Sequence, residues 1–389
     1  MDMLYSARMI PFSLYLHIPF CRHRCNYCDF NTYASLGHLM ADYVRALCRE
    51  MELAARAAGE RLRVHTVYFG GGTPSLLSPQ QLECILSTAA DCFDLTPPLE
   101  ITLEANPGTL TLPHLCQMRS LGVNRLSLGM QSALPDELRL LERQHSYLDV
   151  IEAVRWARRA GFERINLDLI YGLPHQTLDD WCHDLEWALR LHPEHLSLYA
   201  LTLEHGTPLS KWVERGLFAA PEADLAADMY EWAEERLAQA GFESYEISNW
   251  ARRDANGTLL VCRHNLQYWR NLPYLGFGAG AHGYACNIRT ANVRSPRAYI
   301  RRCLTGEAQA FPLTPATVQS RRIRRQEEMA ETMMMGLRLT QEGIPATLFE
   351  MRFGSTLEQV YGETIDELVR LGLLEWAEVA PLSHPYLSL

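Results

Sequence analysis

The sequence predicts an α/β fold in which six strand–helix units form a parallel sheet that precedes a small helical domain. Short apolar runs rich in β-branched or aromatic residues recur through the first half of the chain, as expected of strands covered on both faces. These runs lie at 13–19, 64–70, 99–105, 124–130, 164–172 and 195–201. Helical patterns lie between them, for example at 40–59 and 147–162. Six such repeats predict right-handed crossovers in an open sheet or a partial barrel.

The alternation of strands and helices changes after residue 220. A long amphipathic helix is predicted at 221–242, and an aromatic, glycine-rich segment follows at 262–287. Near the C-terminus, helical patterns precede a predicted β-ribbon, an order typical of a winged-helix-like domain. The helical patterns lie at 324–339, 345–354 and 356–374, and the ribbon at 374–389. The predicted parts are a barrel at 1–220, a connecting segment at 221–310 and a C-terminal domain at 311–389.

The composition is that of an ordinary globular protein, with 48% hydrophobic and 21% charged residues among 389. No apolar run approaches the roughly 20 residues that span a bilayer, and the first residues lack the features of a secretion signal. We therefore expect a cytoplasmic protein whose 11 cysteines stay reduced. The net charge of −10 argues against nucleic acid as the main partner.

Three cysteines lie together on the loop after the first predicted strand. Cys21, Cys25 and Cys28 have the spacing Cys-x3-Cys-x2-Cys within PFCRHRCNYCDF. Thiolates are ligands for zinc, copper(I) and iron–sulfur clusters. A cubane 4Fe–4S cluster usually takes four cysteines, so three would leave one iron open to a small molecule. The alternatives are three unrelated thiols, or a zinc site completed by His23 or a distant residue.

Other polar or glycine-rich motifs follow the remaining predicted strands, at the edge where parallel sheets gather their chemistry. The glycines of FGGGTPS would let the backbone approach a ligand closely. Further candidates at this edge are Glu104, Gln131, Arg143 and Asp168. Together these side chains could hold a ligand that carries an ammonium group, a carboxylate and ribose hydroxyls. Each of them alone would be better explained as a surface or capping residue.

The cysteine motif followed by GGGTP resembles the radical S-adenosylmethionine (SAM) superfamily, and LEANPGT, LGMQS and LDLIYGLP resemble its coproporphyrinogen oxidase-like branch. The resemblance covers about residues 13 to 385 and implies a partial (β/α)6 TIM-like barrel. It also implies a 4Fe–4S cluster on the three cysteines, whose open iron binds SAM. By the same resemblance, Tyr15 and Tyr27 flank the ligand, Gly71, Gly72 and Thr73 contact its methionine moiety, and Glu104, Gln131, Arg143 and Asp168 line the rest of the pocket.

The sequence departs from the oxidases of that branch at the cysteine motif. They carry a further cysteine two positions after the third, where this chain has Phe30. This difference argues against oxidase activity and leaves cluster and SAM binding intact. His175 also stands where the family commonly has glycine.

The segment HNLQYW at 264–269 resembles a motif of the heme chaperones within the branch. A neutral imidazole is a common axial ligand of heme iron, so His264 is the candidate ligand, with Cys262 as an alternative. His282 is a weaker candidate. The competing interpretation is a packed aromatic segment in which His264 is satisfied by hydrogen bonds.

These features predict a heme chaperone that binds a 4Fe–4S cluster, SAM and heme. It would deliver heme to acceptor heme proteins, among them membrane-bound respiratory enzymes reached at the inner face of the membrane. The alternatives are an oxygen-independent coproporphyrinogen III oxidase, or an enzyme that opens or methylates a porphyrin. A homodimer is compatible with the sequence.

Overall fold

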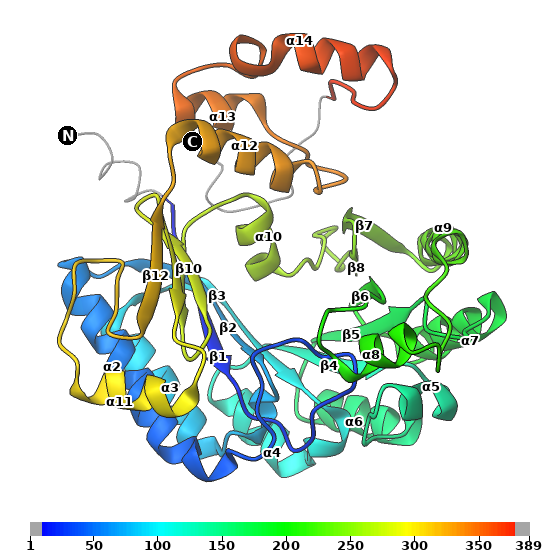
Figure 1. Ribbon diagram of the computed structural model, residues 1–389, viewed down its shortest axis with the longest axis horizontal. Coiled ribbons are helices and arrows are strands. Elements are labelled where there is room, and N and C mark those ends of the chain that lie inside the picture. The colour runs from blue at the N-terminus through cyan, green and yellow to red at the C-terminus, as the bar shows by residue number, and fades with distance from the viewer. Residues whose placement is uncertain (1–9, 378–389) are drawn as a thin grey trace.

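The computed structural model describes residues 10–377 as a strongly curved sheet with helices along its outer side (Figure 1). The sheet has twelve strands in the order β12-β11-β10-β9-β1-β2-β3-β4-β5-β6-β8-β7. Within the described residues, no helix is long and apolar enough to cross a membrane.

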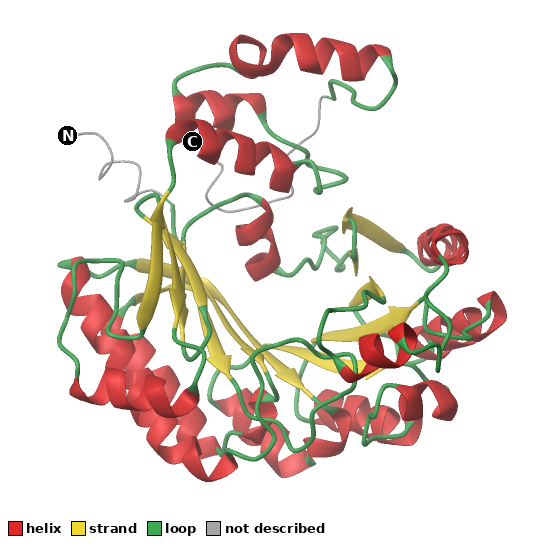
Figure 2. Cartoon of the chain, viewed as in Figure 1, coloured by secondary structure: helices red, strands yellow, loops and turns green. Residues whose placement is uncertain are grey.

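The six predicted parallel strands form the middle of this sheet, which confirms the predicted α/β core. They are β1 (Phe12–Ile18), β2 (Arg63–Gly71), β3 (Asp94–Ala105), β4 (Arg125–Gln131), β5 (Arg164–Tyr171) and β6 (His195–Ala200). The helices between them are α2 (Met40–Ala58), α3 (Pro79–Cys92), α4 (Leu112–Ser120), α5 (Pro135–Leu140), α6 (Tyr147–Arg159) and α7 (Leu178–Leu189). Figure 2 shows these helices along the convex side of the sheet.

Local sequence explains where several of these helices begin. Capping boxes start α3 at Ser78, α6 at Ser146 and α7 at Thr177, so each of these side chains accepts a hydrogen bond from the backbone three residues later. A continuous apolar core lies between the inner faces of the helices and the strands. Leu14 and Phe69 are among its fully buried members. This core makes the parallel strands a rigid support for the loops at their carboxyl ends.

The second half of the chain extends the same sheet at both edges, which differs from the predicted connecting segment at 221–310. Beyond β6 lie β8 (Asn249–Arg252) and β7 (Phe242–Glu246), and beyond β1 lie β9 (Tyr274–Phe277), β10 (His282–Ala285), β11 (Ile288–Asn292) and β12 (Thr317–Arg322). The helices of this half are α8 (Pro208–Glu214), α9 (Ala223–Gln239), α10 (Arg263–Trp269) and α11 (Pro296–Thr305). Because β12 pairs with β11, the sheet ends at Arg322 and passes the predicted boundary at 310.

Three C-terminal helices follow the sheet, as predicted. They are α12 (Arg325–Gly336), α13 (Ala346–Phe353) and α14 (Leu357–Arg370), and they pack around Met329, Phe349, Phe353, Leu357 and Ile365. Residues 374–377 of the predicted β-ribbon form no regular structure, and the rest of the ribbon lies outside the described residues. The predicted wing of the domain is therefore not tested.

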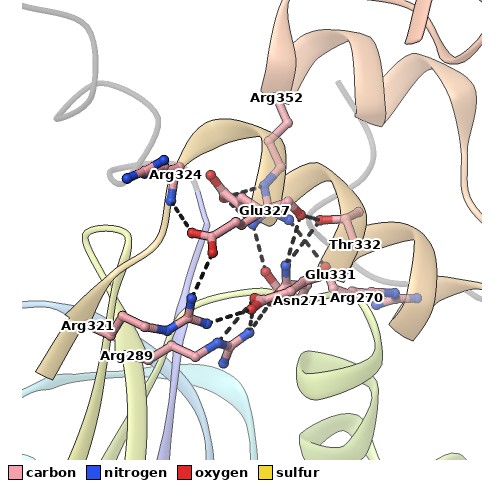
Figure 3. Close-up of polar contacts among 10 residues, drawn as sticks. Arg270, Asn271, Arg289, Arg321, Arg324, Glu327, Glu331, Thr332 and Arg352 are labelled. Carbon is pink, nitrogen blue, oxygen red and sulfur yellow. Dashed lines mark hydrogen bonds and ion pairs between the residues drawn. The ribbon is translucent and has the colours of Figure 1, made fainter. Parts of the chain in front are cut away.

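A polar network joins these helices to the barrel beside the end of α10 (Figure 3). The side-chain amide of Asn271 donates to the Thr332 hydroxyl over 3.1 Å, and its oxygen accepts from Arg289 over 3.1 Å. Arg289 also pairs with Glu331 of α12. The backbone oxygen of Asn271 accepts from Arg352 over 2.8 Å. The C-terminal helices are therefore fixed directly over α10.

Candidate functional site

The cysteine loop lies at the carboxyl end of β1, where the fold was expected to place it. Cys21, Cys25 and Cys28 are free, half-buried thiols. Two residues from elsewhere in the barrel reach them. The Thr73 hydroxyl, just after β2, lies 3.6 Å from the sulfur of Cys21. Nη1 of Arg143, which lies after α5 and not at the strand end expected from the sequence, is 3.6 Å from the sulfur of Cys25. The loop is thus joined to the segments after β2 and α5, and a guanidinium faces one of its thiols.

The three thiols are compatible with a cluster. Within residues 10–377, no three His, Cys, Asp or Glu side chains are grouped so that they could hold one metal ion. In a cubane each thiolate binds a different iron, so the thiols need not converge on one point. Burial raises the pKa of the Cys21 and Cys28 thiols, and binding of metal would remove those protons.

The glycines at the end of β2 are required by close packing. A Cβ on Gly71 would lie 2.4 Å from the His17 ring, and Gly71 has a φ of +113°. A Cβ on Gly72 would lie 2.7 Å from the backbone oxygen of Phe20. After them, the Thr73 N–H donates to the same Phe20 oxygen over 2.8 Å. The predicted residues Gly71, Gly72 and Thr73 therefore lie directly against the start of the cysteine loop.

Two carboxyl groups line the same end of the barrel. Glu104 accepts hydrogen bonds from the Tyr68 hydroxyl over 2.8 Å and from the Gly71 N–H over 3.0 Å. Asp168 accepts from the Ser127 hydroxyl over 2.9 Å and from the Asn166 amide over 2.8 Å. Burial raises the pKa of Glu104 to about 7 and also raises the pKa of Asp168. Two carboxyl groups held in this way would favour a cationic ligand.

Arg143 connects the cysteine loop to the strand ends. Its Nη2 donates to the side-chain oxygen of Asn106 over 2.6 Å and to the backbone oxygen of Gly129 over 2.8 Å. The Nε atom of Arg143 is buried, with no hydrogen-bond partner within the described part of the chain. Gln131 lies nearby at the end of β4, buried, with a φ of +64°. An unsatisfied donor at this position is consistent with a ligand that carries an acceptor.

Of the two predicted tyrosines, Tyr15 lies on β1 and Tyr27 lies within the cysteine loop. The Tyr15 hydroxyl lies 3.0 Å from Nδ1 of His17, whose Nε2 lies 3.0 Å from the backbone oxygen of Asn31. Because that carbonyl can only accept, Nε2 carries the proton and Tyr15 donates to Nδ1. Tyr27 packs against the apolar cluster of Leu141, Ile170 and Leu173.

Sequence reasoning missed three residues of this site. Tyr68 and Asn106 contact predicted residues directly, and His17 packs under Gly71. The alternation of a strand could have indicated His17, because it lies two positions along β1 from the predicted site residue Tyr15. Tyr68 lies opposite Tyr15 on the neighbouring strand β2. Asn106 could have been found as the residue that directly follows β3.

His264 lies inside the barrel, with 1% of its surface exposed. Its Nδ1 lies 2.8 Å from the Thr66 hydroxyl and its Nε2 lies 2.8 Å from the Tyr268 hydroxyl. Because Thr66 donates its proton to Ser13, Nδ1 of His264 must donate and Nε2 must accept from Tyr268. Burial lowers the pKa of His264 to about 3, so the ring is neutral. In this conformation both nitrogens are engaged, as the packed interpretation of the segment expects.

The two alternative heme ligands differ in exposure. Cys262 is fully buried and its thiol lies 3.8 Å from Oε1 of Glu100. His282 is exposed at the start of β10. Phe30, two positions after the third cysteine, has 64% of its surface exposed.

Two family models match this chain. Residues 15–188 match the radical SAM superfamily, and residues 323–378 match the HemN C-terminal domain. Heme chaperone HemW of Lactococcus lactis is 37% identical over 94% of this chain and 91% of that protein. The chain belongs to the HemW family of radical SAM proteins. HemW of Mycobacterium tuberculosis is 46% identical over 74% of this chain and 73% of that protein. HemW of Bacillus subtilis is 36% identical over 95% of this chain and 94% of that protein.

A solved structure agrees with the fold. Coproporphyrinogen III oxidase (HemN) from Escherichia coli superposes with a TM-score of 0.78 at 23% identity, covering 97% of this chain and 88% of that one. This likeness confirms the α/β barrel with its C-terminal helices. Membership of the radical SAM superfamily implies a 4Fe–4S cluster and SAM.

Proposed function

We propose that this chain is a heme chaperone, which binds heme and delivers it to acceptor heme proteins. The observation that carries the proposal is its similarity over nearly its whole length to proteins named heme chaperones, from the sheet to the C-terminal helices. Acceptors would include membrane-bound respiratory enzymes, reached from the cytoplasmic face of the membrane. Heme carried by a dedicated protein would be shielded from water until an acceptor takes it.

Cys21, Cys25 and Cys28 would hold the 4Fe–4S cluster. SAM would bind between the cysteine loop and the strand ends, with Tyr15 and Tyr27 at its sides and Gly71, Gly72 and Thr73 along its methionine moiety. Glu104 and Asp168 offer carboxylates to cationic or hydroxyl groups, Arg143 offers a buried N–H, and Gln131 lies beside them. When bound, the cluster and SAM would supply one-electron chemistry at the carboxyl ends of the strands.

His264 is the proposed axial ligand of heme. Its tautomer suits that role, since Nε2 is unprotonated and its lone pair accepts a hydrogen bond from the Tyr268 hydroxyl. Binding of iron would require that hydroxyl to leave Nε2. The porphyrin would also require α10 to move, because the imidazole is buried between α10 and strands β1 and β2.

Heme titration of the anaerobically reconstituted protein tests this proposal. The parent should bind heme with a Soret band in the visible spectrum. His264→Ala should abolish or shift that band, and Tyr268→Phe should strengthen heme binding because it removes the competing donor while keeping the ring. A parent that binds no heme would refute the function. Unchanged Soret bands in both variants would place the iron ligand elsewhere.

Oxygen-independent coproporphyrinogen III oxidation is the alternative function, and the match to the HemN fold favours it. Phe30 argues against it. We expect no loss of propionate carboxyl groups when the reconstituted protein is incubated with coproporphyrinogen III, SAM and a reductant. If chromatography detects the decarboxylated product, this chain is an oxidase.

A further inference from the structure

We propose that His264 is also a positioning residue of the SAM pocket, acting through Tyr68 on the carboxylate of Glu104. This inference rests on the proposed SAM site. The Tyr68 hydroxyl donates to Oε1 of Glu104 over 2.8 Å, and the Tyr68 ring stacks on the imidazole of His264 with centroids 4.9 Å apart and planes 30° apart. Helix α10 thereby contacts a residue that holds one of the pocket carboxylates.

The imidazole of His264 is a rigid support for the Tyr68 ring. The Thr66 and Tyr268 hydroxyls fix its two nitrogens, and the His264 backbone N–H donates to Oε1 of the buried Glu100 over 3.1 Å. Tyr15 approaches the same ring of Tyr68, with centroids 6.2 Å apart and planes 26° apart. With these neighbours in place, the Tyr68 hydroxyl has little freedom to leave Glu104.

Glu104 depends on this hydroxyl for both its orientation and its charge. One of its oxygens accepts from Tyr68 and the other from the Gly71 N–H, so the carboxylate plane is fixed against the glycine segment. A hydrogen bond to a carboxylate favours the ionised form, and here it opposes the effect of burial. The titratable groups that face Glu104 are Tyr15 on β1, Tyr68 on β2, Asp168 on β5, Tyr199 on β6 and Tyr268 on α10. None of these groups is cationic, and within the described residues Tyr68 is the one among them whose hydroxyl donates to Glu104.

Tyr68→Phe isolates this contact, because it keeps the stacked ring and removes only the hydroxyl. The pKa of Glu104, about 7 in the parent, should rise, so less of the carboxyl would be ionised at neutral pH. SAM binding to the reconstituted protein, measured by equilibrium dialysis from pH 6 to 9, should weaken about tenfold near pH 7. The loss should shrink toward pH 9, where the carboxyl ionises in both proteins.

Tyr299→Phe is a matched control, since the Tyr299 hydroxyl also donates to a buried carboxylate, that of Glu50, over 2.6 Å and has no contact with Glu104 among the described residues. It should leave SAM binding unchanged. A Tyr68→Phe loss of equal size at every pH, or no loss, would overturn the proposal. Iron content and thermal melting of each variant verify that the fold and cluster are retained.

His264→Ala tests the other end of the chain of contacts. It should weaken SAM binding with the same dependence on pH, because Tyr68 loses its support. If His264→Ala changes only the Soret band of heme, His264 is a ligand and the positioning role is wrong. If the parent binds no heme but both variants weaken SAM binding near pH 7, the chaperone function fails while the positioning role stands.

Discussion

At the scale of single residues, backbone conformation determines how side chains around the site are oriented. Gln131 at the end of β4 and His175 after β5 both adopt positive φ, at +64° and +66°. For a residue with a Cβ, this left-handed conformation costs roughly 1 kcal/mol. At Gln131 the turn lies within the site, whereas His175 is exposed. The sequence pointed to a difference at residue 175. Its physical consequence is backbone strain, because a residue with a Cβ adopts a positive φ there.

His175→Gly should stabilise the fold. Glycine adopts a φ of +66° without strain, although it also gains freedom in the unfolded chain, so we expect a net gain of up to about 1 kcal/mol in the free energy of unfolding. Urea unfolding measures it. His175→Ala is the matched control, because it removes the imidazole but keeps the Cβ, and it should give no gain. Equal stabilities for the glycine and alanine variants would exclude backbone strain.

At the scale of elements, periodicity was enough to predict the parallel core but not the edges of the sheet. Strands β1 to β6 are buried on both faces and read as apolar runs. By contrast, β12 has the sequence TVQSRR and is exposed along most of its length, so nothing in its composition marks a strand. Its place is set by pairing with β11, a contact that sequence patterns do not reveal.

Helix α10 marks the same limit for the site. The residues HNLQYW suggested a heme ligand, but the surroundings of His264 come from Thr66 and Tyr68 on β2, about 200 positions earlier in the chain. The cysteine loop and strand-end motifs were easier to place, because parallel strands bring their carboxyl ends to one edge. The sequence did not reveal which residue each of these side chains contacts.

Asn271→Gly tests how firmly the C-terminal helices are joined to α10. Glycine tolerates the φ of +50° at this position, so the backbone should not change. The variant loses the hydrogen bonds of the Asn271 side chain with Thr332 and Arg289, and the weaker one that its amide donates to the backbone oxygen of Glu328. At about 1 kcal/mol for each hydrogen bond, we expect a loss of about 2–3 kcal/mol in the stability of the docked helices. Hydrogen exchange should become faster in α12, with α3 as the internal control. Unchanged exchange in α12 would show that apolar packing alone holds these helices.

At the scale of the whole molecule, one buried carboxylate joins parts of the chain that are far apart in sequence. Glu50 lies on α2 and accepts hydrogen bonds from the Gly278 N–H over 2.9 Å and from the Tyr299 hydroxyl over 2.6 Å. Its other oxygen accepts from the Asn292 amide over 2.9 Å and from the Thr314 hydroxyl over 2.7 Å. These contacts hold the later strands against the first unit of the barrel, so that one edge of the sheet is fixed to the helix that follows β1.

Glu50→Gln should therefore loosen the attachment of the later strands. The new amide group is a donor, so wherever it points it meets two of the four donors that the carboxylate accepted. Leaving buried donors unsatisfied predicts a loss of about 2–4 kcal/mol in the free energy of unfolding, and earlier proteolytic cleavage between residues 278 and 314 than in the parent. Glu52→Gln, two positions along the same helix, removes only exposed ion pairs with Arg49 and Arg56, so it should cost no more than about 0.5 kcal/mol. Urea unfolding followed by circular dichroism, with limited proteolysis beside it, compares the two variants. Equal losses in both would mean that Glu50 contributes no more than a surface charge, and that the edge strands are held by the apolar core between α2, α11 and the sheet.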